Sequence, residues 1–194
     1  MSEDTITNPV TGERVTFVET SSDTGGARTI AEVVVTPGGG VPRHQHANHV
    51  ERIEVLSGVI EVVIGRAVRR LAAGERIEIP AGSAHVWRNA SPDGQLAFRA
   101  TMTPGHPGFE LFLRVLFGLG RDGGLRPNGL PRRFSDLALL TQWDPSVLAG
   151  PKRLLSPVMK WVARRPSVRA RGDELRRRYG ETTAPATPLV QARP

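Results

Sequence analysis

The chain has 194 residues, and its hydrophobic content of 39% suits one domain of ordinary size with an appendage. It contains no cysteine, which excludes disulfides and thiolate metal sites, so any bound metal must have nitrogen and oxygen ligands. The charge is uneven: residues 1–113 carry ten Lys/Arg and 13 Asp/Glu, whereas residues 114–194 carry 16 and six. A mildly acidic segment therefore precedes a strongly basic one.

The first residues are acidic and polar, unlike a signal peptide, and no run of about 18 apolar residues predicts a transmembrane helix. We therefore expect a cytoplasmic protein. Residues 1–13 are interpreted as an N-terminal arm. Residues 14–103 have a β pattern, in which short Val- and Ile-rich runs alternate with Gly- and Pro-containing turns. The predicted strands include Arg28–Thr36, Val50–Leu56, Val59–Ile64, Arg76–Pro80 and Gln95–Met102.

Residues 104–180 are predicted to form a basic helical extension. Apolar residues recur at helical spacing over 109–117, and a second helix is expected to begin with Ser135 as its N-cap and to end before Pro145. A third is expected over 152–165 and a fourth over 173–179. Residues 181–194 have the composition of a disordered tail.

Four of the five histidines lie between residues 44 and 85. His44 and His46 are two residues apart, so on a strand they share one face and can bind one ion. Glu51 needs a bend in the preceding chain to join them, and His85 follows a tight turn that can deliver a third imidazole. Three imidazoles and a carboxylate suit one divalent ion of Fe, Mn, Ni, Cu or Zn, with two octahedral positions left open.

Two sequence motifs contain these residues: Gly38-x5-His44-x-His46-x4-Glu51-x6-Gly58 and Gly74-x5-Pro80-x-Gly82-x2-His85-x3-Asn89. They resemble the two motifs of the cupin superfamily, with all ten positions present. The resemblance implies an all-β fold, a cupin jelly-roll barrel, to which the mainly α-helical C-terminal extension is added. It also implies that the metal ligands are His44, His46, Glu51 and His85, and that two copies pair as a homodimer.

Strand alternation predicts which side chains face the interior of this barrel. Ile53 and Trp87 are predicted to bind substrate, because the parity of Glu51 and His85 turns these strand neighbours inward, and Phe98 is expected to join them. Such an interior is apolar apart from the metal ligands and suits a small, partly aromatic or ketonic molecule that chelates the metal. The same side chains would otherwise simply fill the core. His49 is interpreted as a solvated turn residue, with a role in orienting a ligand or as a general base left open, and His106 as a loop residue.

The basic C-terminal region has two interpretations. Its amphipathic segments 109–118 and 152–165 could pack on the barrel or in a dimer, or they could contact an anionic membrane surface peripherally. Nucleic-acid binding is not expected, because the basic residues lack interleaved aromatics and a helix-turn-helix pattern.

Two functions remain open from the sequence. The first is a metal-dependent enzyme acting on a small organic molecule, a dioxygenase or an isomerase, with Glu51 as a catalytic residue that alternates between metal ligand and proton acceptor. The second is a non-catalytic module that binds a metal and a small ligand, associated with a membrane through the basic helices. A complete set of metal ligands serves both.

Overall fold

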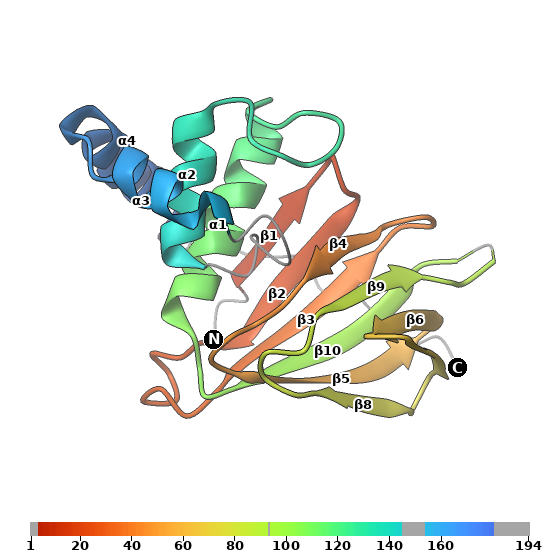
Figure 1. Ribbon diagram of the computed structural model, residues 1–194. Coiled ribbons are helices and arrows are strands. Elements are labelled where there is room, and N and C mark those ends of the chain that lie inside the picture. Colours follow the sequence, from red (N-terminus) through yellow and green to blue (C-terminus); the bar gives the residue numbers. More distant parts are fainter. Residues whose placement is uncertain (1–3, 93, 145–153, 181–194) are drawn as a thin grey trace.

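The computed structural model describes residues 4–92, 94–144 and 154–180. Ten strands form two antiparallel sheets that face each other, and four helices gather beside one edge of the larger sheet (Figure 1). The larger sheet has the order β1-β2-β3-β10-β5-β8 and the smaller one β4-β9-β6-β7. The strands are β1 (Asp4–Asn8), β2 (Glu13–Glu19), β3 (Thr29–Val35), β4 (Gly40–His44), β5 (Val50–Ser57), β6 (Val59–Ile64), β7 (Ala67–Ala72), β8 (Arg76–Ile79), β9 (His85–Asn89) and β10 (Leu96–Thr103).

The core between the sheets follows from strand alternation. In β10, every second residue from Leu96 to Met102 is buried, and the same alternation buries Ile53 and Val55 in β5. Trp87 and Phe98 meet edge to face across the two sheets, with ring centroids 5.0 Å apart. Burial of these apolar side chains is the main stabilising contribution to the sandwich.

Two glycines of the sequence motifs make turns that other residues would strain. Gly58 joins β5 to β6 with φ at 79°, and a Cβ there would lie 2.6 Å from the carbonyl oxygen of Gln95. Gly82 has φ at 76°, and its N–H donates to the carbonyl of His46 over 2.7 Å. This bond ties the turn before His85 to the loop that carries His46.

The helices are α1 (Pro107–Arg121), α2 (Phe134–Trp143), α3 (Ser156–Ala163) and α4 (Pro166–Tyr179). Helix α1 is fixed to the larger sheet by buried polar contacts. Glu110 accepts hydrogen bonds from the Ser21 N–H at 2.7 Å and from the Thr29 hydroxyl at 2.5 Å, and Arg114 pairs with Asp4 of β1. The apolar side chains of α1 are therefore buried or half-buried in the protein.

The expected β core and helical extension are present, with corrections. The whole chain is not all-β, and the strands form two sheets and not a closed barrel. The segment expected to be an N-terminal arm contains β1, which pairs with β2 in register Asp4↔Phe17. Helix α2 begins at Phe134 with Arg133 as its N-cap, α3 is shorter than expected, and α4 begins seven residues earlier, at Pro166. The tail expected at 181–194 lies outside the described residues.

No helix among the described residues is long and apolar enough to span a lipid bilayer.

Candidate metal centre

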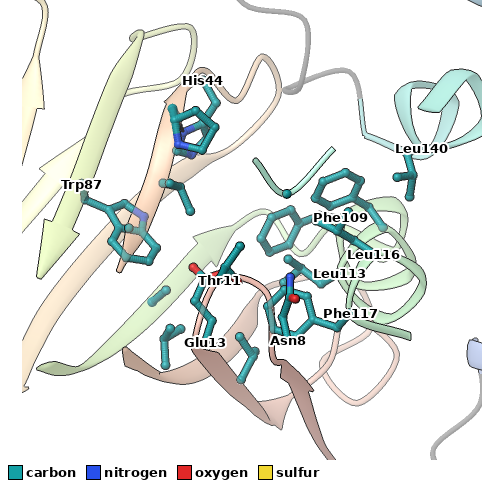
Figure 2. Close-up of a pocket in the computed structure, with 18 of the residues that line it drawn as sticks. Asn8, Thr11, Glu13, His44, Trp87, Phe109, Leu113, Leu116, Phe117 and Leu140 are labelled. Carbon is teal, nitrogen blue, oxygen red and sulfur yellow. Dashed lines mark hydrogen bonds between the residues drawn. The ribbon is translucent and has the colours of Figure 1, made fainter. Parts of the chain in front are cut away.

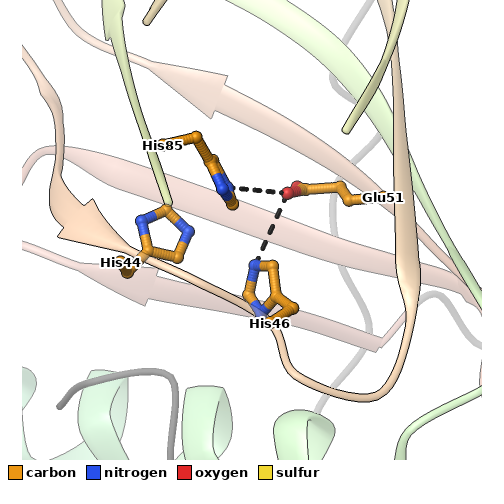
Figure 3. A group of neighbouring side chains, drawn as sticks. All are labelled: His44, His46, Glu51 and His85. Carbon is orange, nitrogen blue, oxygen red and sulfur yellow. Dashed lines mark ion pairs between the residues drawn. The ribbon is translucent and has the colours of Figure 1, made fainter. Parts of the chain in front are cut away.

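Four side chains from three strands and one loop converge between the sheets (Figure 3). His44 ends β4, Glu51 lies in β5, and His85 begins β9, while His46 lies in the loop between β4 and β5. Strand pairing brings the distant parts together, because His44 pairs directly with His85 in the β4–β9 register. The structure thus brings together all four residues that the sequence motifs indicate.

The ligand atoms of this group are close enough to share one ion. One nitrogen or oxygen from each residue lies within 4.8 Å of the others. The Glu51 Oε2 atom lies 3.1 Å from His85 Nε2 and 3.5 Å from His46 Nε2. With metal–ligand bonds of about 2.1 Å, neighbouring octahedral ligands lie about 3 Å apart and opposite ones about 4.2 Å apart. The spacing therefore matches a coordination sphere after small inward movements.

Backbone carbonyls orient two of the imidazoles. The His44 Nδ1 atom lies 2.9 Å from the Pro42 carbonyl oxygen, and the His85 Nδ1 atom lies 3.0 Å from that of Ser83. Because a carbonyl only accepts hydrogen bonds, each Nδ1 carries the proton and each Nε2 keeps its lone pair for a metal. His85 Nε2 and Glu51 Oε2 are buried and have no well-aligned hydrogen-bond partner within the described chain. Buried polar atoms left in this way are costly, and a cation between them would remove the cost.

The electrostatics keep two of these ligands, His44 and Glu51, in the protonation states that bind metal. Burial lowers the pKa of His44 to about 4, with further lowering by His85 and His46, so its imidazole is neutral at pH 7. Burial alone would raise the pKa of Glu51, but its contacts with His46 and His85 outweigh burial and hold it well below its ordinary value. Burial lowers the pKa of His46, and the contact with Glu51 more than reverses this. The neutral His44 and the ionised Glu51 thus fit a divalent cation, which would replace the proton that the Glu51 carboxylate favours on His46.

The metal ligands open into a cavity of about 280 Å³ between the larger sheet and helix α1 (Figure 2). His44, His46 and Glu51 line it, as do Trp87 and Phe98 from the sheets. The opposite wall consists of apolar side chains of the helical extension: Phe109, Phe112, Leu113, Leu116, Phe117, Leu137 and Leu140. The helical extension is therefore part of the cavity and not a separate appendage.

The predicted substrate-binding residues occupy two kinds of position. Trp87 and Phe98 line the cavity, whereas Ile53 is fully buried in the core between the sheets and does not line it. Strand parity correctly predicts that the side chain of Ile53 points inward. Parity cannot decide whether an inward side chain of a sandwich packs in the core or lines the cavity. The helices that make this distinction are far away in the sequence.

His49 is buried and does not lie in a solvated turn, contrary to the preferred interpretation. Only 3% of it is exposed, and its ring stacks on that of His46 with centroids 4.4 Å apart. Burial, then His46 and His106, lower its pKa to about 4. His106 is the N-cap of α1, where its Nδ1 accepts a hydrogen bond from the Phe109 N–H over 2.8 Å. The imidazole of His49 thus sits between the metal ligands and the start of the helix.

The sequence analysis missed a polar group on the cavity wall: Asn8, Thr11 and Glu13. Glu13 is only 8% exposed, and burial raises its pKa to about 7 although the Thr11 hydroxyl donates to it over 2.6 Å. The available signal was parity: Glu13 shares a face of β2 with Val15 and Phe17, which are buried. All three residues precede the expected start of the β region at residue 14.

Comparison with known proteins agrees with this architecture and defines its class. Residues 31–102 match the family described as cupin domain. This chain therefore contains a cupin domain, which covers nearly all of β3 to β10 and the complete set of candidate metal ligands. The strands β1 and β2 and all four helices lie outside the matched residues.

Solved structures similar to this chain are cupins of low identity. KdgF from Halomonas sp. is 22% identical, with 48% of this chain and 81% of that chain covered and a TM-score of 0.43. An RmlC-like cupin from Shewanella frigidimarina is 16% identical over 56% and 89% of the two chains, with a TM-score of 0.48. The cupin domain of Schizosaccharomyces pombe Cnp3 is 14% identical over 47% and 64%, with a TM-score of 0.43. No curated protein matches the chain significantly.

Proposed function

We propose that this protein is a metal-dependent enzyme that acts on a small, largely apolar organic molecule. The observation that carries the proposal is the continuity of the two sites: His44, His46 and Glu51 line the same cavity as the aromatic side chains of α1. A molecule in that cavity would meet apolar surface on most sides and the metal ligands on one.

The four ligands would hold one divalent ion of Fe, Mn, Ni, Cu or Zn. Such an ion supplies a Lewis acid for an oxygen of the bound molecule and, if it is redox-active, a position for dioxygen. The apolar walls exclude water, which strengthens electrostatic interactions inside the cavity. Glu51 is the proposed catalytic residue, because its ionised carboxylate borders the cavity and can accept a proton. Dioxygenation and isomerisation are the two reaction classes that we propose.

Metal analysis tests the site first. Elemental analysis of the untagged protein should give about one equivalent of a transition metal, and His46→Ala and Glu51→Ala should lose it while they remain folded. His106→Asn is the matched control, since it removes a nearby histidine outside the ligand set and keeps a residue that caps helices well. Unchanged metal content in both ligand variants would remove the basis of the proposal.

The alternative is a module that binds its ligand without converting it. Oxygen uptake or product formation by the iron-loaded protein with candidate ligands supports the enzyme. Saturable, metal-dependent binding that leaves the ligand unchanged under the same conditions supports the module. The complete ligand set is common to both, so turnover is the deciding measurement.

We also propose that helix α3 binds the surface of an anionic membrane. Leu154 and Trp161 are 83% and 59% exposed, and the Arg165 guanidinium lies 3.9 Å from the centre of the Trp161 ring. Lys160 and Arg164 are exposed beside them. Apolar side chains flanked by cations complement anionic headgroups over an acyl layer.

A further inference from the structure

The polar group of Asn8, Thr11 and Glu13 lies apart from the metal ligands in the cavity. In Figure 2, His44 lies apart from these three residues, with Trp87 on one side of the space between them and Phe109 of α1 on the other. The buried polar side chains of the cavity wall therefore form two groups separated by apolar surface. The metal ligands account for only one of them.

Glu13 is an unusual residue for an apolar cavity. Its carboxyl group is buried, and in the part of the chain that the structure describes the Thr11 hydroxyl is the one group that donates to it, over 2.6 Å to Oε2. No cation of the described chain forms an ion pair with it, although Arg14 of β2 and Arg121 of α1 line a second hollow to which Glu13 and Asn8 also belong. A buried carboxyl group without a cation is costly unless something else binds it.

Asn8 adds an unused donor to this group. Its Oδ1 atom accepts a hydrogen bond from the Val10 N–H over 3.1 Å, which fixes the orientation of the amide. Its Nδ2 atom is buried and has no hydrogen-bond partner among the described residues. A buried donor without a partner costs about 1–3 kcal/mol. Among the described residues, Glu13 thus has the Thr11 donor and Asn8 Nδ2 has no partner, so a bound molecule could supply further hydrogen bonds to both.

We propose that the cavity binds a small molecule with two polar ends. One end carries an oxygen group that chelates the metal. The other end carries a hydroxyl or amino group that Glu13 and Asn8 bind. The distal group donates to the carboxyl of Glu13, and where it is a hydroxyl its oxygen accepts from Asn8 Nδ2. This inference rests on the proposed function, because the chelating end requires the metal centre. A raised pKa of Glu13, to about 7, agrees with it, since a carboxyl near half-protonation can both donate and accept.

Matched chelating probes test the distal contact. Benzohydroxamic acids carrying an amino group or a methyl group at the same ring position have nearly the same size, and meta and para pairs cover two distances from the chelating end. Binding to the metal-loaded protein is measured by calorimetry. In at least one pair, the amino compound should bind about tenfold more tightly than the methyl compound, the effect of one buried hydrogen bond.

Two substitutions assign that preference to Glu13. Glu13→Met fills a similar volume without an acceptor and should reduce the preference to less than about threefold, whereas Glu13→Gln keeps an acceptor and should retain it. Glu32→Met, on the neighbouring strand β3 and outside the cavity, is the matched control and should behave as the parent. Circular dichroism and metal content of each variant confirm that the fold and the metal centre are intact.

The outcomes separate this inference from the proposed function. Two results would overturn the two-ended ligand without affecting the proposed metal-dependent function. The first is metal-dependent binding in which the methyl compounds bind as tightly as the amino compounds. The second is a preference for the amino compounds that remains in Glu13→Met. Binding that a His44→Ala/His85→Ala variant retains contradicts the proposed function, because the chelating end then has no role. Absence of binding by every probe contradicts both.

Discussion

The buried carboxyl of Glu13 makes the stability of this protein depend on pH in a direction opposite to that of most acidic residues. Burial raises its pKa from 4.5 to about 7. Between these two values the folded protein keeps a proton that the unfolded chain has released, so unfolding becomes easier as the pH rises. The cost is absent below the pKa of the unfolded chain and complete above about 7.

The magnitude follows from the two pKa values. At 1.36 kcal/mol per pH unit, the difference between 4.5 and about 7 corresponds to about 3 kcal/mol of lost stability. Glutamine has nearly the same shape, accepts the Thr11 hydroxyl and does not titrate. Glu13→Gln should therefore gain up to about 3 kcal/mol over the parent between about pH 4.5 and pH 7.5, and nothing further at higher pH.

Urea denaturation of both proteins across this pH range measures the difference. Glu54→Gln is a suitable control: contact with Arg76 lowers the pKa of this outward glutamate, so its substitution should give a change of the opposite sign. Thr11→Val removes the hydroxyl that lowers the pKa of Glu13 and should move the transition to higher pH. A difference between Glu13→Gln and the parent that is constant with pH would refute the reasoning.

Three further predictions concern other parts of the molecule. Removal of the metal with a chelator should lower the melting temperature of the parent, because a ligand at 1,000 times its Kd stabilises a fold by about 4 kcal/mol. The melting temperature of His85→Ala, which lacks a metal ligand, should not change. Calorimetry measures both melting temperatures. Arg114→Met should cost about 3–5 kcal/mol in urea denaturation, since it leaves the Asp4 carboxylate buried and unpaired, and a cost below 1 kcal/mol would argue against a buried ion pair. Trp161→Ser should weaken pelleting with phosphatidylserine vesicles but not with neutral ones, and Phe134→Ser, an equally exposed aromatic on α2, should not. If Trp161→Ser instead halves the mass measured by light scattering, the apolar face of α3 belongs to a homodimer.

The candidate metal centre could be predicted from the sequence because its information is local. His44, His46 and Glu51 lie within eight residues, and His85 follows a turn whose glycine marks it. The strands that carry alternating apolar residues could be predicted for the same reason. Side-chain parity within one strand needs no knowledge of the rest of the fold.

The elements that were missed lack this local signal. Strand β4 begins in a run of glycines and contains Pro42, which is tolerated because β4 is the edge strand of its sheet. Strand β7 is the other edge of that sheet and exposes most of its side chains, so it has no apolar alternation. The burial of His49 depends on the start of α1, nearly 60 residues further along the chain.

The role of the helical extension follows from how α1 is attached. Glu110 binds Ser21 in the turn after β2 and Thr29 of β3, and Arg114 pairs with Asp4 of β1, all in buried positions. Ordinary mobility of a surface helix would leave such groups without partners at a cost of several kcal/mol. The helix is thus held as a fixed wall, and its phenylalanines face the metal ligands across the cavity. Removal of residues 104–194 would therefore open the cavity and leave Asp4 unpaired, so a shortened protein that keeps the cavity must include β1 and α1 as well as the cupin domain.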